Sequence, residues 1–176
     1  MLQARKTHLP LALGAVLIVL AALTRLLPHP PNFTPIEAMA LFGGAMLLNR
    51  WWAIAITLGA MLLSDLLLGV HDLQLLVYGC LLGGVFLGVW VGPQARLRRV
   101  VSAGLISAIG FFLITNFAVW ATSGMYTRDF AGLLLCYELA LPFFRNSVAA
   151  LAVYGLALFG AAHLYQRWAT PAAARV

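Results

Sequence analysis

The chain has 176 residues, of which 63% are hydrophobic and only 9% carry a charge. Soluble domains carry a charge on roughly 25% of their residues, so this composition excludes an ordinary soluble domain and indicates a protein embedded in lipid. The net charge of +6 comes from basic residues scattered through short connections. That pattern orients membrane proteins, so nucleic acid is not expected as a partner.

The apolar runs predict an all-α membrane protein, with one transmembrane domain over residues 1–176 and six spanning helices. The first run covers residues 9–27 and follows Arg5 and Lys6, as in a signal peptide. No small-residue cleavage site comes after it, so we expect a retained helix. It ends at the proline cluster of residues 28–31, because proline cannot continue a helix. The other spans are expected at about residues 35–49, 51–68, 73–91, 100–121 and 146–166.

The basic residues gather on one side of the expected bundle. Eight lie on the side that holds both termini: Arg5, Lys6, Arg50, Arg96, Arg98, Arg99, Arg167 and Arg175. Three lie on the opposite side, namely Arg25, Arg128 and Arg145. By the positive-inside rule both termini face the cytoplasm, which predicts an N-in/C-in protein of a bacterial inner membrane.

The acidic residues show the reverse distribution, since all five fall on the outer side: Glu37, Asp65, Asp72, Asp129 and Glu138. His29, His71 and Cys80 also lie at or just below that side. Acidic residues count little in the positive-inside rule, so their placement is a separate observation. It predicts that the polar site is at the outer end of the bundle.

Two acids near residue 69 are the first candidates for that site. Asp65 falls within an expected span, and ionisable groups at membrane depth are costly and generally functional. Asp72 directly precedes the span at 73–91, so a role as its N-cap explains it equally well. His71 is either part of the site or simply an interfacial residue.

Cys80 lies two turns into the fourth span, about 12 Å below Asp72 at 1.5 Å per residue. The glycines around it, in the segment Val77–Gly84, allow close approach by another helix or by a ligand. A free cysteine also commonly serves as a small buried hydrophobic residue. A disulfide with Cys136 is a further alternative.

Two more polar residues stand out near the outer side. Asn116 places an amide within an apolar run, where it serves either helix-to-helix hydrogen bonding or ligand contact. Arg145 opens the last expected helix, where the helix dipole disfavours a cation. It is therefore expected to pair with Glu138 or with an anionic group of a ligand.

Several catalytic motifs do not occur in the sequence. There is no G-x-x-x-x-G-K-[ST] phosphate loop, so no ATP site of that type is expected. There is also no H-E-x-x-H, no paired C-x-x-C and no Ser/His/Asp set in one place. A self-contained hydrolase is therefore not expected.

Five segments carry a resemblance to a known family: Pro30–Ala38, Ser64–Gly69, Tyr78–Cys80, Asn116–Trp120 and Pro142–Asn146. Together with six short N-in/C-in spans, they resemble the S-components of energy-coupling-factor vitamin transporters. The likeness is greatest to the solitary vitamin B12 transporters of the BtuM family. The resemblance implies an S-component-like bundle that binds cobalamin at the outer face and mediates its uptake.

The resemblance also implies roles for individual residues. The cysteine of the fourth helix in that family is expected to reach the cobalt of cobalamin, which makes Cys80 the axial ligand, as the thiolate. A thiolate trans to cyanide would also assist reductive removal of that group, a hypothesis that the spectrum of cyanocobalamin with protein and reductant tests. The resemblance further implies that other side chains contact the corrin ring, its amides or its phosphate: His29, Phe42, Asp65, Asp72, Tyr78, Asn116 and Arg145.

The first span departs from the S-component pattern. It has no A-x-x-x-A pair, the motif with which S-components commonly dock on an energising ATPase module. Ala157 and Ala161 have that spacing, but in the last span. Docking on a shared module is therefore doubtful, in agreement with a solitary transporter. Two alternatives stay open: uptake of another vitamin or a metal ion, and a non-transport membrane subunit in which Cys80 only packs.

Overall fold

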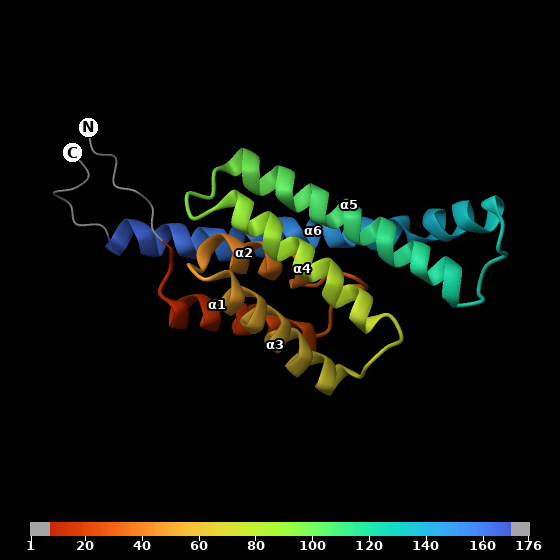
Figure 1. The fold of residues 1–176 in the computed structure, drawn as a ribbon, viewed down its shortest axis with the longest axis horizontal. Helices are drawn as coiled ribbons and strands as arrows, with labels where there is room; N and C mark the ends of the chain where they lie inside the picture. The colour runs from red at the N-terminus through yellow and green to blue at the C-terminus, as the bar shows by residue number, and fades with distance from the viewer. Residues whose placement is uncertain (1–7, 170–176) are drawn as a thin grey trace.

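In the computed structural model, which describes residues 8–169, all regular structure is helical (Figure 1). The elements are α1 (Leu11–Leu23), the 3-10 turn η1 (Thr24–Leu26), α2 (Ile36–Met46), α3 (Arg50–Leu68), α4 (Gln74–Val91), α5 (Leu97–Thr122) and α6 (Phe130–Ala169). Four of them, α3 to α6, are long and apolar enough to cross a membrane, whereas α1 and α2 are shorter. The prediction of an α-helical membrane protein is therefore confirmed at this level.

Successive helices run back and forth along the long axis of the molecule (Figure 1). The start of α1 and the end of α6 therefore lie at the same end, and the turn between α3 and α4 lies at the other. Arg5, Lys6 and Arg175, which the sequence placed with the termini, lie outside the described residues.

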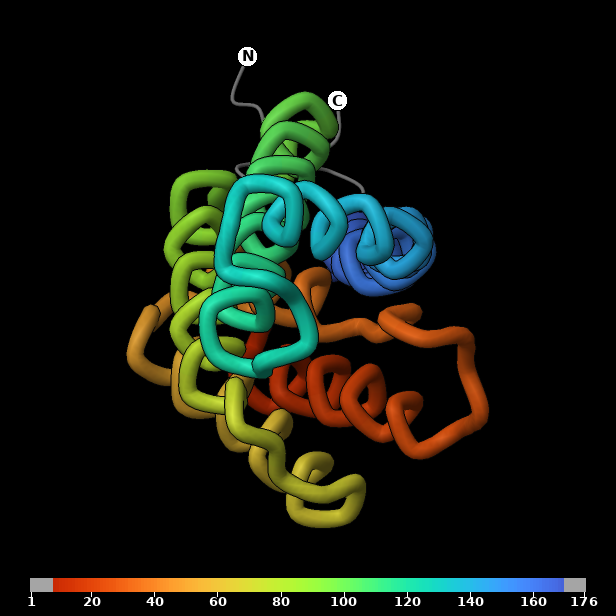
Figure 2. The backbone as a smooth tube through the Cα atoms, turned by 90° about the vertical axis from the view of Figure 1, so that its right-hand side faces the viewer, coloured from red at the N-terminus to blue at the C-terminus, as the bar shows by residue number. Residues whose placement is uncertain are grey.

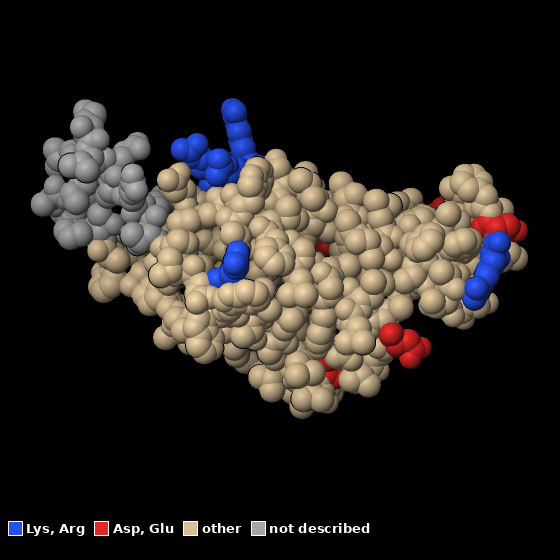
Figure 3. Space-filling view, viewed as in Figure 1, with Lys and Arg blue, Asp and Glu red and all other residues tan. Residues whose placement is uncertain are grey.

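The charges follow the same axis. Arg96, Arg98 and Arg99 lie at the junction of α4 and α5, at the end where α1 begins. In Figure 3 the acidic atoms lie in the opposite half, toward the junctions α3–α4 and α5–α6. We refer to this second end as the acidic end of the bundle.

Helix α2 is the centre of the fold. Ten of its eleven residues are buried, and it is enclosed by the other helices (Figure 2). A Cβ atom on Gly44 would lie 1.9 Å from the Val85 carbonyl oxygen of α4, and one on Gly88 would lie 2.2 Å from that of Leu41. Helices α2 and α4 therefore pack backbone against backbone, which only glycine permits at these two positions.

Helix α6 differs most from the sequence prediction, since it begins at Phe130 rather than at about residue 146 and runs for 40 residues. It contains Pro142, which lacks the N–H that would bond to the carbonyl four residues earlier. Membrane helices tolerate this loss. At 1.5 Å per residue α6 is about 60 Å long, and its first turns project with the end of α5 beyond the rest of the bundle (Figure 1).

Candidate functional site

A buried ion pair joins three elements at the acidic end. The guanidinium of Arg25 in η1 lies 2.7 Å from Asp65 Oδ1 near the end of α3, and it also bonds to Ser64 Oγ. The other oxygen of Asp65 accepts hydrogen bonds from the Tyr78 hydroxyl at 2.8 Å and from Gln74 Nε2 at 3.3 Å, both in α4. Asp65 is thus fully partnered, and in this structure it ties η1, α3 and α4 together.

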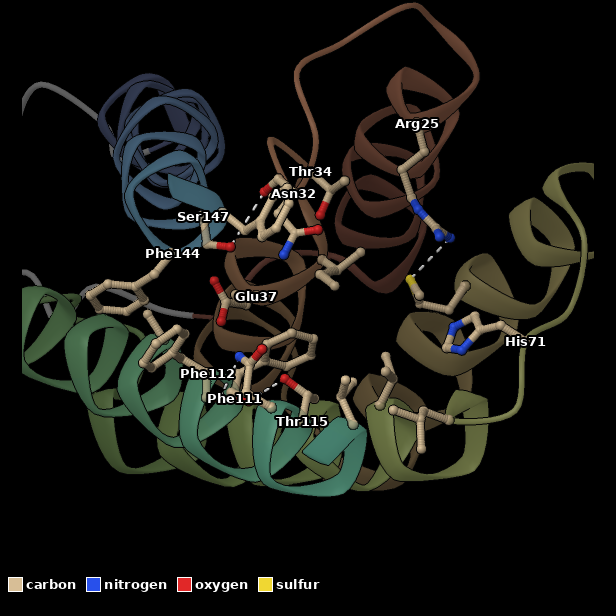
Figure 4. A pocket seen from close by; sticks show the side chains of 18 residues that line it. Arg25, Asn32, Thr34, Glu37, His71, Phe111, Phe112, Thr115, Phe144 and Ser147 are labelled. Atoms are coloured by element: carbon tan, nitrogen blue, oxygen red, sulfur yellow. Dashed lines mark hydrogen bonds between the residues drawn. The ribbon is translucent and has the colours of Figure 1, made fainter. Parts of the chain in front are cut away.

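Beside this network lies a cavity of about 320 Å³, which we call the polar cavity (Figure 4). Residues from η1, from each of the helices α2 to α6 and from two connections line it, among them Arg25, Glu37, His71, Phe111, Asn116 and Ser147. Phe112, Phe143 and Phe144 supply apolar surface on the side of α5 and α6. A partly open cavity with a few polar groups among aromatic side chains is typical of a small-molecule site.

Glu37 is the most unusual residue of the polar cavity. It lies in the first turn of α2 and is only 4% exposed. Its Oε1 atom is buried and accepts no hydrogen bond from residues 8–169. In Figure 4 its side chain points from α2 into the cavity. From the sequence, Glu37 was expected among the outer acids but not as a site residue, although its position one residue into an apolar helix was the available signal.

Several hydroxyl and amide groups of the cavity are bonded to the backbone. Thr115 Oγ1 donates to the Phe111 carbonyl at 2.8 Å, and Asn116 Nδ2 donates to the Phe112 carbonyl at 2.8 Å. Ser147 Oγ donates to the Asn32 carbonyl at 3.4 Å. Asn116 lines the polar cavity together with His71, and its contact with a ligand stays a prediction.

Cys80 lies in a different place from the polar cavity. It lines an apolar groove of about 350 Å³ between α4 and α5, with Gly79, Gly83 and Gly110. A Cβ atom on any of these glycines would have no atom within 4 Å, so the groove is open beside the thiol. Phe111 is common to the groove and to the polar cavity, so its side chain lies between the two.

Both cysteines are free thiols, so the alternative of a disulfide does not hold in this structure. Cys80 is half-buried in α4, whereas Cys136 is buried in α6 and its Sγ donates to the Asn116 carbonyl at 3.4 Å. Cys136 is thus a packing residue between α5 and α6. Between residues 8 and 169, no group of three or more His, Cys, Asp or Glu side chains is arranged to hold a metal ion.

The remaining predicted residues do not line the polar cavity. Phe42 is fully buried and packs edge-on against Phe159, with ring centroids 5.5 Å apart. His29 is exposed, with its Nδ1 atom 2.9 Å from the Pro30 carbonyl. Tyr78 belongs to the Asp65 network. A ligand role for these three side chains stays a prediction.

Two structural expectations were wrong. Asp72 does not cap α4, because the helix begins at Gln74 and its N-cap residue is Leu73, which makes no side-chain capping bond. Arg145 does not open a helix, because α6 already begins at Phe130, so the dipole argument for that residue no longer applies. Asp72 and Arg145 are both exposed at the acidic side of the molecule.

Comparison with known proteins gives one match. No curated protein and no solved structure matches the chain. The sequence model of a family of unknown function, DUF6580, matches residues 5–173, which is nearly the whole chain. The chain therefore belongs to the family of unknown function DUF6580.

Proposed function

We propose that this chain is an inner-membrane protein of six spans that binds cobalamin at its acidic end and mediates its uptake. The alternating helix directions support six crossings with both termini in the cytoplasm. The gathering of Arg96, Arg98 and Arg99 at the end where α1 begins supports the same orientation. The segments that resemble the BtuM family, above all Tyr78–Cys80, point to cobalamin as the ligand.

The observation that carries the proposal is the environment of the Cys80 thiol. It is a free, half-buried thiol beside open space at Gly79 and Gly83, next to the polar cavity. The flat corrin ring of cobalamin requires such open space if its cobalt ion is to approach the sulfur atom. The thiolate is the ligating form of cysteine, and a bound metal ion favours its formation.

The size of the polar cavity defines how cobalamin would be held. Its volume of about 320 Å³ is at the low end of the range for small-molecule sites. A corrinoid is too large for it, so the cavity would take a group on the rim of the ring, while the corrin lies against α4 and α5. Phe111 lines both cavities and would have to turn aside for the cobalt to reach Cys80.

A thiolate ligand would also support removal of cyanide from cyanocobalamin. With an external one-electron reductant, Co(III) is reduced to Co(II), the bond between cobalt and carbon breaks, and cyanide leaves with both bonding electrons. Electron donation from Cys80 on the opposite face would weaken that bond. In this reaction Cys80 would be the catalytic residue.

The proposal is tested by the absorbance spectrum of detergent-purified protein, after incubation with cobalamin and removal of free ligand. We expect the wild type to retain the vitamin with a shifted cobalt spectrum, and Cys80→Ser to lose the shift. Cys136→Ser is the matched control, since it removes the other free thiol and should behave as the wild type. A colourless wild type would overturn the proposal.

A second candidate is uptake of a smaller vitamin by the same S-component-like bundle. The volume of the polar cavity favours it, because a compact solute would fit entirely. A wild type that binds no cobalamin, but is stabilised against heat by one member of a panel of smaller vitamins, would establish it. A protein that binds none of them would favour a non-transport membrane subunit.

A further inference from the structure

We propose that the polar cavity is a subsite for a carboxamide of the ligand, and that Glu37 accepts the hydrogen bond from its N–H group. The inference rests on the proposed function, because cobalamin carries carboxamides on the rim of its ring. It assigns a recognition role to a residue that lies apart from the thiol at Cys80.

Glu37 carries a buried hydrogen-bond acceptor that lacks a donor within the described residues. Glu37 is 4% exposed, and its Oε1 atom has no hydrogen-bond donor among residues 8–169. A buried polar atom without a partner is unfavourable, and the cost is larger for a charged group. The side chain points into the cavity rather than into the packed core (Figure 4). An N–H group of a bound ligand would supply the missing donor.

The hydroxyl groups of Thr115 and Ser147, which line the same cavity, do not supply the missing donor. The hydroxyl protons of Thr115 and Ser147 are donated to backbone carbonyls, and Asn116 donates to the carbonyl of Phe112. The oxygen atoms of these side chains keep lone pairs that can accept further bonds. The hydroxyl oxygens that line the cavity therefore offer acceptors for the N–H group of a carboxamide, and the second N–H of Asn116 can donate to its carbonyl oxygen.

Arg25, which also lines the cavity, is already paired with an acid. The guanidinium of Arg25 is bound to Asp65 at 2.7 Å and also to Ser64. In Figure 4 it lies across the cavity from Glu37. Arg25 therefore neutralises Asp65, and Glu37 remains available to the ligand.

The test compares cyanocobalamin with its monocarboxylic acids, in each of which one rim carboxamide is hydrolysed to an acid. We expect one of these acids to bind the wild type at least about tenfold more weakly, because the N–H donor is lost and a second carboxylate faces Glu37. Glu37→Gln should bind cyanocobalamin about tenfold more weakly than the wild type. The same variant should recover affinity for that one acid, because the glutamine amide donates to a carboxylate.

Glu138→Gln is the matched control, since it makes the same chemical change at an exposed position outside the cavity. It should discriminate among the acids as the wild type does. Equal binding of all the acids by the wild type would overturn this inference and leave the proposed function standing. A wild type that binds no cyanocobalamin would overturn both. If Glu37→Gln does not fold, the comparison of ligands on the wild type can still overturn the inference.

Discussion

Arg25 and Asp65 form an ion pair with a distance of 2.7 Å from guanidinium nitrogen to carboxylate oxygen, and their side chains are 14% and 4% exposed. The pair connects the end of the first helical segment to the end of α3. Tyr78 and Gln74 extend it to α4 through the second carboxylate oxygen. Four side chains from three elements thus close the bundle beside the polar cavity.

Removing the charge of Asp65 is expected to destabilise the protein. Asp65→Asn leaves Arg25 buried without a counter-charge, and breaking a buried ion pair in this way costs about 3–5 kcal/mol. The free energy of unfolding in detergent, from a denaturant titration, measures the loss. Asp72→Asn is the control, because Asp72 is exposed and surface changes are generally within about 0.5 kcal/mol. Equal stabilities of the two variants would refute the structural role of Asp65.

The close contact between α2 and α4 predicts that replacing glycine by alanine has opposite effects on stability at Gly88 and at Gly59. In Gly88→Ala the new methyl group would meet the Leu41 carbonyl at 2.2 Å, and overpacking of this kind costs about 1–3 kcal/mol. In Gly59→Ala the methyl group meets no atom within 4 Å, and alanine favours the helix by up to about 1 kcal/mol over glycine. Unfolding temperatures of the two variants should therefore move in opposite directions. A shift in the same direction would contradict the close packing of α2 on α4.

Phe111 is expected to limit access to Cys80. A charged methanethiosulfonate reagent does not enter the apolar groove from lipid, so it reaches the thiol through the polar cavity. In a Cys136→Ser background, Phe111→Ala should raise the rate of Cys80 modification roughly tenfold, because access controls thiol reactivity. Ile114→Ala is the control, because Ile114 lines the groove but not the polar cavity. Equal rates in both variants would show that Phe111 does not separate the two spaces.

Asp129 makes the stability of the start of α6 depend on pH. Its Oδ1 accepts bonds from the Gly132 amide at 2.7 Å and from the Thr127 hydroxyl at 3.0 Å, and these bonds lower the pKa of Asp129. A lowered folded-state pKa means that the stabilisation is complete above the unfolded-state pKa of about 3.9. It is lost as the pH falls through the lower, folded-state pKa.

The measurement is the difference in unfolding temperature between the wild type and Asp129→Asn as the pH is lowered. The variant retains a capping side chain but not its charge. The difference should be constant near neutral pH and should disappear in acid. A difference that persists unchanged below about pH 2 would show that the charge of Asp129 is not what stabilises the helix start.

The long apolar helices were predictable from the sequence, because length and hydropathy alone define them. The expected span at 51–68 is observed at Arg50–Leu68, and that at 73–91 is observed at Gln74–Val91. The first half of α6 was missed, because Pro142 and the polar residues before it suggested a connection. Proline acts locally, whereas Phe112 of α5 packs against Tyr137 and Phe144 of α6, which lie on either side of Pro142.

The end of the bundle at which the candidate site lies was predictable from the sequence, but the residues that line it were not. The acids gather at one end as expected, because residue order and the number of crossings determine which end each residue reaches. Which side chain faces the interior depends on the rotation of each helix, and the weak hydrophobic asymmetry of an apolar helix does not define it. Glu37 was therefore missed, and the burial of Phe42 in the core was not foreseen, whereas its ligand role stays a prediction.

The short length of α2 has a consequence for biogenesis. Its 11 residues extend over about 16 Å, about half of the roughly 30 Å hydrocarbon core of a bilayer. Alone in lipid, such a segment would leave its terminal backbone groups without partners. We therefore expect α2 to take up its position only after the neighbouring helices have inserted and can surround it. Glu37 lies in the first turn of α2, so we expect the polar cavity to be completed only after this step, and variants that slow it should be degraded faster by membrane quality-control proteases.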